Sequence, residues 1–254
     1  MKRPALILTL GLLAALLAPL ASGAPRPSAD IGALIDAAEP GATVRPPAGE
    51  YHGRLRIAKP IVLDGAGLVT IDGGGGGDVV EIACGGVTVR GLLIRGTGQD
   101  VSSEPAAIRV LAGPAVVEDN RIEDALFGVD LREAPGSTIR RNIISGKDLE
   151  PGRRGDAIRL WWSHGCTIED NRVRGTRDLV FWYSEDLTIA RNHVTDSRYG
   201  LHFMYSHSTN LIGNELAGNS VGVYLMYSNS IRLSGNIMTN NRGASGYGIG
   251  LKDC

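Results

Sequence analysis

The sequence predicts an all-β fold, a parallel β-solenoid with about 22 residues in each coil. Two observations predict it: a column of regularly spaced asparagines, and a short alternation of apolar and polar residues around each of them. The asparagines follow one another at 22, 29, 21, 22 and 22 residues: Asn120, Asn142, Asn171, Asn192, Asn214 and Asn236. A repeat of this length that carries strands and no helical periodicity is typical of stacked β coils.

Each asparagine is flanked by a short predicted strand. An apolar residue lies three positions before it and another lies two positions after it, with mostly polar residues between them. A period of two indicates a strand with one buried face. Because an asparagine amide can hydrogen-bond the next coil at a turn, we expect this column to be structural. Leucine-rich repeats share the spacing but need a leucine-dense consensus, which is absent here.

Composition excludes several classes of protein. The 26 Lys and Arg residues nearly balance the 27 Asp and Glu residues, so the chain lacks the basic field that nucleic-acid binding requires. Hydrophobic residues make up 43% of the chain, too many for a disordered protein. The 35 glycines show no strict third-residue period, which excludes collagen, and they suit the many tight turns of a solenoid.

The first 24 residues have the pattern of a secretory signal. Lys2 and Arg3 precede an apolar run from Ala5 to Ala18, and small residues follow it. The run is shorter than the roughly 20 residues that span a bilayer. We therefore expect a signal peptide over residues 1–24 and a single β-helix domain of about ten coils over residues 25–254.

Other local signals fit this domain. Residues 30–38 are expected to form a short capping helix, with Ser28 or Asp30 as its N-cap. Residues 73–77 are all glycine and predict a turn. Two coils carry about seven extra residues each, near 98–105 and 147–154, and these insertions are expected to frame one strand of the coil.

The three cysteines are not expected to form an intrachain disulfide. Cys84, Cys166 and Cys254 are about three and four coils apart in sequence. At ~4.8 Å per coil, both separations exceed the ~7 Å limit between bridged Cα atoms.

One strand of the coil has an unusual outward face. Aligning the repeats gives two inward columns: Ile158, Leu179, Leu201, Val223 and Leu160, Phe181, Phe203, Leu225. The alternate columns should point outward: Arg159, Val180, His202, Tyr224 and Trp161, Trp182, Met204, Met226. We call these eight outward residues the strip. An exposed contiguous apolar surface usually marks a binding site, so the strip is where we expect function.

The strip contains a candidate metal site. His202 and Met204 lie two apart on one strand, and Met226 stacks on Met204 one coil further on. Imidazole and thioether ligands together suit Cu(I). The alternative, that the methionines fill gaps or contact a protein partner, stays open. His164, Glu185 and His207 share a turn column and form a weaker candidate group.

A carbohydrate-active enzyme, a polysaccharide lyase or epimerase, is the alternative function. Asp156 and Asp178 come from adjacent coils, and Arg159, Arg177 and Arg198 lie nearby in sequence. Paired carboxylates with arginines suffice for acid–base chemistry. Cross-coil ion pairs would explain the same residues without catalysis.

The strip and its flanking residues resemble a known family. The segments GDAIRLWWS (155–163), RDLVFWYS (177–184), RYGLHFMYS (198–206), VGVYLMYS (221–228) and SGYGIGLKD (245–253) resemble the NosD family, the periplasmic maturation factors of nitrous oxide reductase.

That resemblance implies a right-handed parallel β-helix without catalytic residues. It implies a periplasmic subunit of an ABC-type complex that works with a permease, an ATPase and a copper-chaperone lipoprotein to assemble the copper sites of nitrous oxide reductase. The expected transient copper ligands, as Cu(I), are His202, Met204 and Met226, and the expected partner surface is Trp161, Trp182 and Tyr224. Members of the family continue past residue 254, so the C-terminal end is expected to be truncated.

Overall fold

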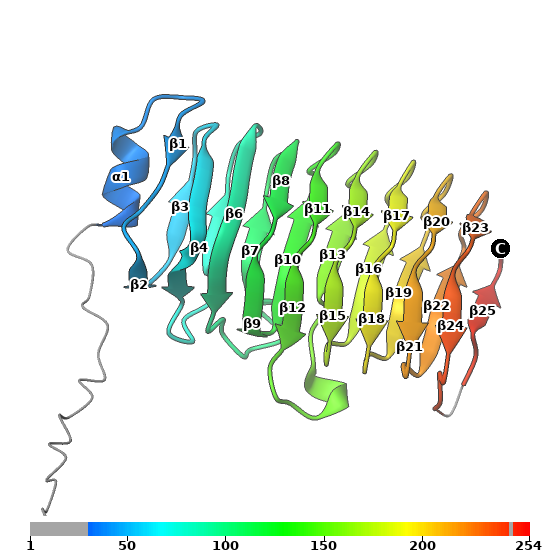
Figure 1. Cartoon of the computed structure of the whole chain (residues 1–254). Helices are drawn as coiled ribbons and strands as arrows, with labels where there is room; N and C mark the ends of the chain where they lie inside the picture. The colour runs from blue at the N-terminus through cyan, green and yellow to red at the C-terminus, as the bar shows by residue number, and fades with distance from the viewer. Residues whose placement is uncertain (1–29, 244–245) are drawn as a thin grey trace, which may run out of the picture.

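The computed structural model describes residues 30–243 and 246–254. The chain winds into a long parallel β-helix, in which successive coils stack side by side from the N-terminal to the C-terminal end (Figure 1). The predicted fold class is therefore confirmed. The signal-peptide prediction for residues 1–24 lies outside the described residues.

The β-strands form two parallel sheets, one of nine strands and one of sixteen. The nine-stranded sheet contains β3 (Leu55–Ile57), β5 (Val80–Ile82), β7 (Ala106–Val110), β10 (Phe127–Arg132), β13 (Ile158–Trp161), β16 (Asp178–Trp182), β19 (Tyr199–Met204), β22 (Val221–Met226) and β25 (Ile249–Lys252). Each coil contributes one strand to this sheet, so the described coils number nine rather than the expected ten.

The sixteen-stranded sheet begins with β1 (Thr43–Val44), β2 (Gly49–His52), β4 (Val62–Asp72) and β6 (Val87–Arg95). Beyond β6 it continues as two rows of short strands. The first row is β8 (Ala115–Glu118), β11 (Thr138–Arg140), β14 (Thr167–Glu169), β17 (Thr188–Ala190), β20 (Asn210–Ile212) and β23 (Arg232–Ser234). The second row is β9 (Arg121–Ala125), β12 (Ile143–Gly146), β15 (Arg172–Arg174), β18 (His193–Thr195), β21 (Glu215–Ala217) and β24 (Ile237–Thr239).

The asparagine column holds the two rows together at the turn between them. Asn171 is typical: its side chain donates to Asn192 Oδ1 at 3.0 Å and to the carbonyl of Ile139 at 2.9 Å. Its own Oδ1 accepts the backbone N–H of Asn142 at 3.0 Å. The structural interpretation of this column is thus confirmed. A second ladder, Asn219 and Asn241, was not predicted.

The N-terminal end is closed by the predicted helix. Helix α1 (Ile31–Ala37) starts at Asp30, whose side chain accepts the backbone N–H of Gly32 at 2.8 Å. Ile31 and Ile35 are buried against the first coils, so the helix covers the apolar end of the stack.

The two insertions are loops that lead into strands of the nine-stranded sheet. The first joins β6 to β7, and the second joins β12 to β13 and contains a short 3₁₀ helix, η1 (Pro151–Arg153). Cys84, Cys166 and Cys254 are free.

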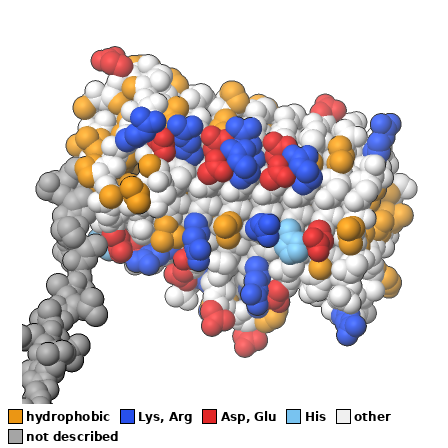
Figure 2. Space-filling view, viewed as in Figure 1, with side chains coloured by type: hydrophobic (Ala, Val, Ile, Leu, Met, Phe, Trp, Pro, Cys, Tyr) orange, Lys and Arg blue, Asp and Glu red, His pale blue; other side chains and the backbone are white. Residues whose placement is uncertain are grey.

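The outer surface of the sixteen-stranded sheet carries cross-coil ion pairs. Arg141 pairs with Asp119 and Arg191 with Asp170, both at 2.8 Å. In Figure 2, basic and acidic side chains alternate along the solenoid on the face that is shown. Such exposed pairs contribute little individually to stability.

Candidate metal centre

The strand register brings the strip residues together as the repeats predict. Arg159 lies opposite Val180, Val180 opposite His202, and His202 opposite Tyr224. In the second column Trp161 lies opposite Trp182, Trp182 opposite Met204, and Met204 opposite Met226. The two inward columns are buried in the hydrophobic core.

The expectation that the whole strip is exposed is wrong for three residues of its first column, whereas Tyr224 in that column is half-buried. Arg159 is 5% exposed, Val180 1% and His202 6%. These side chains do not join the core cluster but are covered from outside by other groups. The second column is more accessible: Trp161 is 37% exposed, whereas Trp182, Met204 and Met226 are half-buried.

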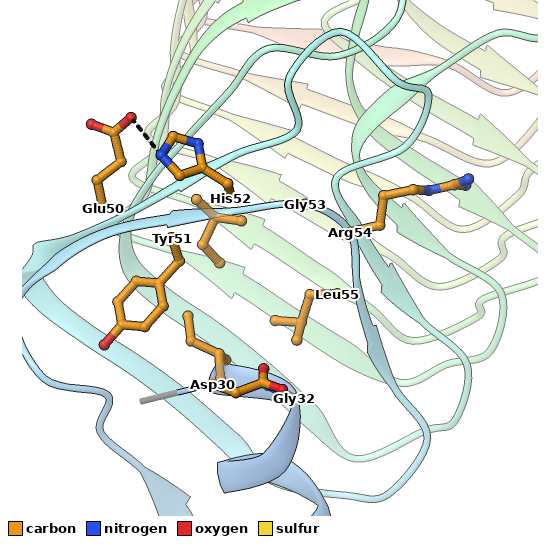
Figure 3. Close-up of a pocket in the computed structure, with 10 residues that line it drawn as sticks. Asp30, Gly32, Glu50, Tyr51, His52, Gly53, Arg54 and Leu55 are labelled. Carbon is orange, nitrogen blue, oxygen red and sulfur yellow. Dashed lines mark hydrogen bonds and ion pairs between the residues drawn. The ribbon is translucent and has the colours of Figure 1, made fainter. Parts of the chain in front are cut away.

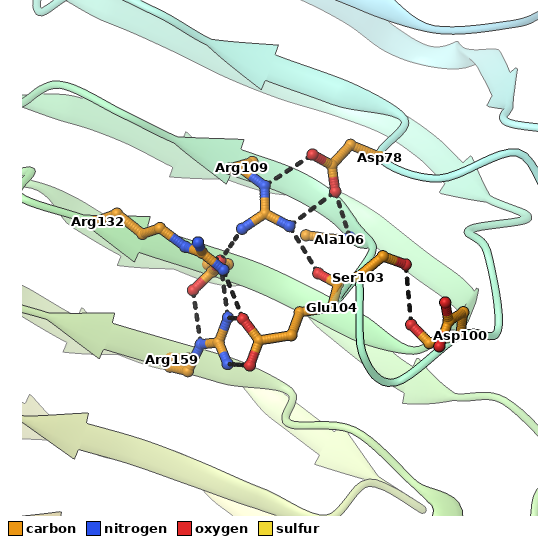
Figure 4. A network of polar contacts seen from close by, with 9 residues as sticks. Asp78, Asp100, Ser103, Glu104, Ala106, Arg109, Arg132 and Arg159 are labelled. Atoms are coloured by element: carbon orange, nitrogen blue, oxygen red, sulfur yellow. Dashed lines mark hydrogen bonds and ion pairs between the residues drawn. The ribbon is translucent and has the colours of Figure 1, made fainter.

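A loop covers Arg159. Glu104, from the insertion between β6 and β7, accepts two hydrogen bonds from the Arg159 guanidinium at 2.8 and 2.9 Å. Arg159 also bonds both oxygens of Asp130, which is fully buried. Figure 4 shows this network, which Asp78, Arg109 and Arg132 extend. The loop is therefore fixed to the strip, as expected for a rim.

A cavity lies beside this rim. It has a volume of about 260 Å³ and is lined by Glu104, Arg132, Arg159, Trp161 and Trp182. Its arginines are already paired with carboxylates, so the cavity offers no free positive charge.

His202 is held by one ring nitrogen and unpaired at the other. Its Nδ1 lies 3.2 Å from Oδ2 of Asp178. Asp178 is fully buried, accepts the backbone N–H of Tyr199 at 3.0 Å and forms an ion pair with Arg198. The Nε2 of His202 is buried and has no hydrogen-bond partner.

The partners of Asp178 keep it charged. Burial favours the neutral acid, but the hydrogen bonds from His202 and Arg198 prevail and lower the pKa of Asp178 below its ordinary value. A charged Asp178 accepts a proton-bearing Nδ1, which makes Nε2 the nitrogen with the free lone pair.

Aromatic rings enclose His202. The ring of Tyr199 lies 5.0 Å away, that of Tyr224 6.1 Å and that of Trp182 6.3 Å, measured between ring centroids. The contact with Trp182 is edge-to-face, at 86°. These rings explain why an outward-pointing histidine is nearly inaccessible.

Asp156 and Asp178 lie together, as expected for adjacent coils. The backbone N–H of Ala157 donates to the carbonyl of Asp178 at 2.9 Å. Burial, followed by the charge of Asp178, raises the pKa of Asp156 to about 7. However, Asp156 is 5% exposed and Asp178 is 0% exposed, so a polysaccharide chain does not reach this pair in the structure.

Next to the strip runs a ladder of stacked aromatic rings that sequence reasoning did not predict. Trp162, Tyr183, Tyr205 and Tyr227 stack in successive coils, with centroids 4.8 to 5.3 Å apart and planes within 9°. All four have a positive φ, near 50°, which is uncommon for bulky residues. Each of them directly precedes a serine that recurs in the repeat, and this recurrence was the available signal: Ser163, Ser184, Ser206 and Ser228.

The weaker histidine group has a structural role. His164 Nδ1 accepts the backbone N–H of Glu185, and His207 Nδ1 accepts that of Asn229, both at 3.1 Å. In the described ranges, three His, Cys, Asp or Glu side chains come close enough to share a metal ion only at Glu50, His52 and Asp72.

That grouping lies beside a cavity of about 320 Å³ near helix α1 (Figure 3). Arg95 already pairs with Glu50 and Asp72, at 2.9 and 2.8 Å. The Arg95 guanidinium thus offsets part of the negative charge of the two carboxylates and competes with a cation for their oxygens.

The fold and this face define a class of protein: a parallel β-helix with a buried histidine, unpaired at Nε2, on neighbouring strands with two methionines. The model of the NosD family, described as a periplasmic copper-binding protein, matches residues 144–254, which include all three candidate ligands. Together with the relatives below, this match shows that the C-terminal part of the chain is similar to the NosD family.

Two curated relatives are each named a probable ABC transporter binding protein NosD. The one from Pseudomonas aeruginosa is 34% identical over 134 residues, which is 52% of this chain and 31% of that protein. The one from Stutzerimonas stutzeri is 30% identical over 137 residues, 53% of this chain and 31% of that protein. The matches thus span about a third of the length of these relatives.

Solved structures share the fold. The A-module of Azotobacter vinelandii mannuronan C-5 epimerase AlgE6 superimposes with a TM-score of 0.65 and 16% identity, covering 83% of this chain and 72% of that one. The AlgE4 A-module gives 0.57 and 19%, covering 84% and 74%. At these identities the likeness concerns architecture alone. In the part of the chain that the structure describes, no helix is long and apolar enough to cross a membrane.

Proposed function

We propose that this chain binds copper transiently, as Cu(I), through Nε2 of His202 and the sulfurs of Met204 and Met226. The observation that carries the proposal is the buried Nε2 of His202, which has no partner although Nδ1 is held by Asp178. A buried polar atom without a partner is costly and calls for an explanation, and a bound ion supplies one.

The donor set suits a soft monovalent ion. Thioethers select Cu(I), and a histidine ligand usually donates its other ring N–H to a carboxylate, as His202 does to Asp178. Met204 and Met226 lie opposite each other in neighbouring strands, with Met204 two residues after His202. All three ligands are neutral, and the surrounding rings limit the access of water.

The names of the relatives support a role with an ABC transporter, and the resemblance of the strip segments to the NosD family supports a role in copper-site assembly. We propose that the protein works in the periplasm as the non-catalytic accessory subunit of an ABC-type complex that assembles the copper sites of nitrous oxide reductase. Its partners would be a permease, an ATPase and a copper-chaperone lipoprotein. Trp161, Trp182 and Tyr224 border the copper ligands in the same two columns, which makes them the proposed docking surface for the chaperone.

Anaerobic Cu(I) titration against a chromophoric chelator tests the ligand assignment. We expect the double variant Met204→Ala, Met226→Ala, and separately His202→Ala, to bind Cu(I) at least about 100-fold more weakly, a loss of about 2.7 kcal/mol. Met238→Ala is the matched control, because this methionine packs against the core on another strand. Unchanged affinity in the double variant would refute the assignment.

A carbohydrate-active enzyme is the second candidate. The raised pKa of Asp156 beside Asp178 is the observation that favours it, since a carboxyl group that titrates near neutral pH suits general acid–base catalysis. The burial of both groups argues against it. Turnover on a panel of uronans and pectins would revive this candidate, and inactivity on all of them would close it.

A further inference from the structure

We infer that Trp182 forms a wall of the copper site, with its indole π face against the bound monovalent cation, and so makes the site selective for Cu(I) over divalent ions. This inference rests on the proposed function. It gives Trp182 a role inside the site, beyond the contact surface that the sequence suggests.

The register places Trp182 next to both kinds of ligand. Its backbone lies opposite Met204 in the neighbouring strand, and Met204 in turn lies opposite Met226. Its ring centroid lies 6.3 Å from that of His202 in the first column and 5.8 Å from that of Trp161 in the second. The indole therefore borders the space between an imidazole and a thioether.

The orientation of His202 points the free nitrogen into that space. Nδ1 faces Asp178, at the beginning of β16, whereas Trp182 lies at the end of the same strand. The two nitrogens of an imidazole point to nearly opposite sides of the ring. Nε2 is therefore directed towards the strand ends, where Trp182 and Met204 lie.

Among the residues that the structure describes, no aromatic ring stacks parallel to the Trp182 indole. Its two ring contacts, with Trp161 at 69° and with His202 at 86°, are edge-to-face rather than stacked. The buried Nε1 of Trp182 also has no acceptor, although a buried indole N–H usually finds one. Packing around the proposed ligands, not a hydrogen bond, therefore sets the position of this ring.

Cation–π attraction suits this position. A tryptophan face is the strongest aromatic partner for a cation, and the attraction grows when water is excluded. Cu(I) bound by neutral soft ligands can accept such a face, whereas a divalent ion such as Zn²⁺ favours further nitrogen, oxygen or water ligands that the indole cannot supply. The ring would thus favour the monovalent ion.

Anaerobic titration of the whole chain with Ag(I), a redox-inert soft monovalent probe, and with Cu(I) tests the inference. Trp182→Phe should bind both ions about 3- to 30-fold more weakly than the unmodified chain. It should also lose most of the quenching of tryptophan fluorescence that accompanies binding. Trp162→Phe, which changes an indole of the aromatic ladder outside the strip, is the matched control and should keep both.

Two further measurements distinguish the loss of a contact between Trp182 and the ion from misfolding of the Trp182→Phe variant. Trp182→Tyr keeps an aromatic face and should give an intermediate affinity. In the unmodified chain, the indole Nε1–H resonance of Trp182 should shift on addition of Ag(I) more than those of Trp161 and Trp162.

The outcomes separate the two proposals. If His202→Ala and the double methionine variant weaken Ag(I) binding but Trp182→Phe behaves as Trp162→Phe does, only the role of Trp182 is refuted. If those ligand variants bind Ag(I) as tightly as the unmodified chain, or if the unmodified chain does not bind it, both proposals fail.

Discussion

The hydrogen bond between Asp178 and Nδ1 of His202 should set the copper affinity of the site. Asp178→Asn keeps an acceptor of similar shape but removes the charge that favours a proton on Nδ1. Carboxylates that support a metal-binding histidine typically contribute 10- to 100-fold to affinity, so we expect about a 10-fold weaker Cu(I) complex by chelator competition. Asp170→Asn, which changes an ion pair with Arg191 on the sixteen-stranded sheet, should leave the affinity unchanged.

Asp156 should make the stability of the protein fall as the pH rises. Its pKa is raised from 3.8 to about 7, so the folded chain binds more protons than the unfolded chain between these values. The free energy of unfolding then decreases from about pH 4 to about pH 7, and the penalty is complete above that range. Asp178 acts in the opposite sense, but its pKa is lowered, so its contribution changes only at more acidic pH.

Asp156→Asn should remove this pH dependence. Thermal unfolding measured from pH 4.5 to pH 8 should show a flatter profile for the variant, and at pH 8 its midpoint should be higher by ~2 °C or more. Parallel profiles for the two chains would show that Asp156 titrates normally.

For single residues, the sequence predicted which side chains lie in neighbouring columns but not how buried they are. Counting residues placed His202, Met204 and Met226 in neighbouring columns, because parallel coils keep a constant register. The register shift between Asp178 and Val180 puts Tyr199 opposite Asp178, and simple counting does not foresee such a bulge. The partner of His202 Nδ1 was therefore missed.

Among the elements, the turn that carries the asparagine column should be sensitive to side-chain loss. Asn171→Ala removes the acceptor for the buried N–H of Asn142 and the donor to the carbonyl of Ile139. Leaving such buried groups unpaired costs roughly 2–4 kcal/mol, and we expect the thermal midpoint to fall by ~5–10 °C. Asn210→Ala, an exposed position in β20, should change it by less than about 2 °C. Equal effects would contradict the ladder.

The sequence located the two inserted loops but did not predict the contacts that their side chains make. Two irregular spacings of the asparagines located the loops correctly, since extra residues in a repeat must leave the coil. The contact of Glu104 with Arg132 and Arg159 joins residues 28 and 55 positions apart. Side-chain pairing over such distances depends on the path of the loop, which the spacing does not define.

For the whole molecule, a solenoid derives its stability from contacts between neighbouring coils, so its two ends should differ from its middle. At the N-terminal end helix α1 buries Ile35, which is 1% exposed. In the last described coils Met238 is half-buried and Leu251 is 66% exposed, whereas Leu216 and Leu225, which lie opposite them one coil earlier, are buried.

Hydrogen exchange followed by mass spectrometry should therefore show a gradient along the stack. Amides of β23, β24 and β25 should exchange fastest, those of β13 and β16 slowest, and those of β3 and β5 should stay protected because α1 covers them. Ile35→Asp should selectively deprotect β3 and β5, since it places a charge in the apolar contact of the helix, while β16 should keep its protection. Uniform exchange of all strands in both chains would instead show that the coils open as one cooperative unit, and would contradict a stack stabilised coil by coil.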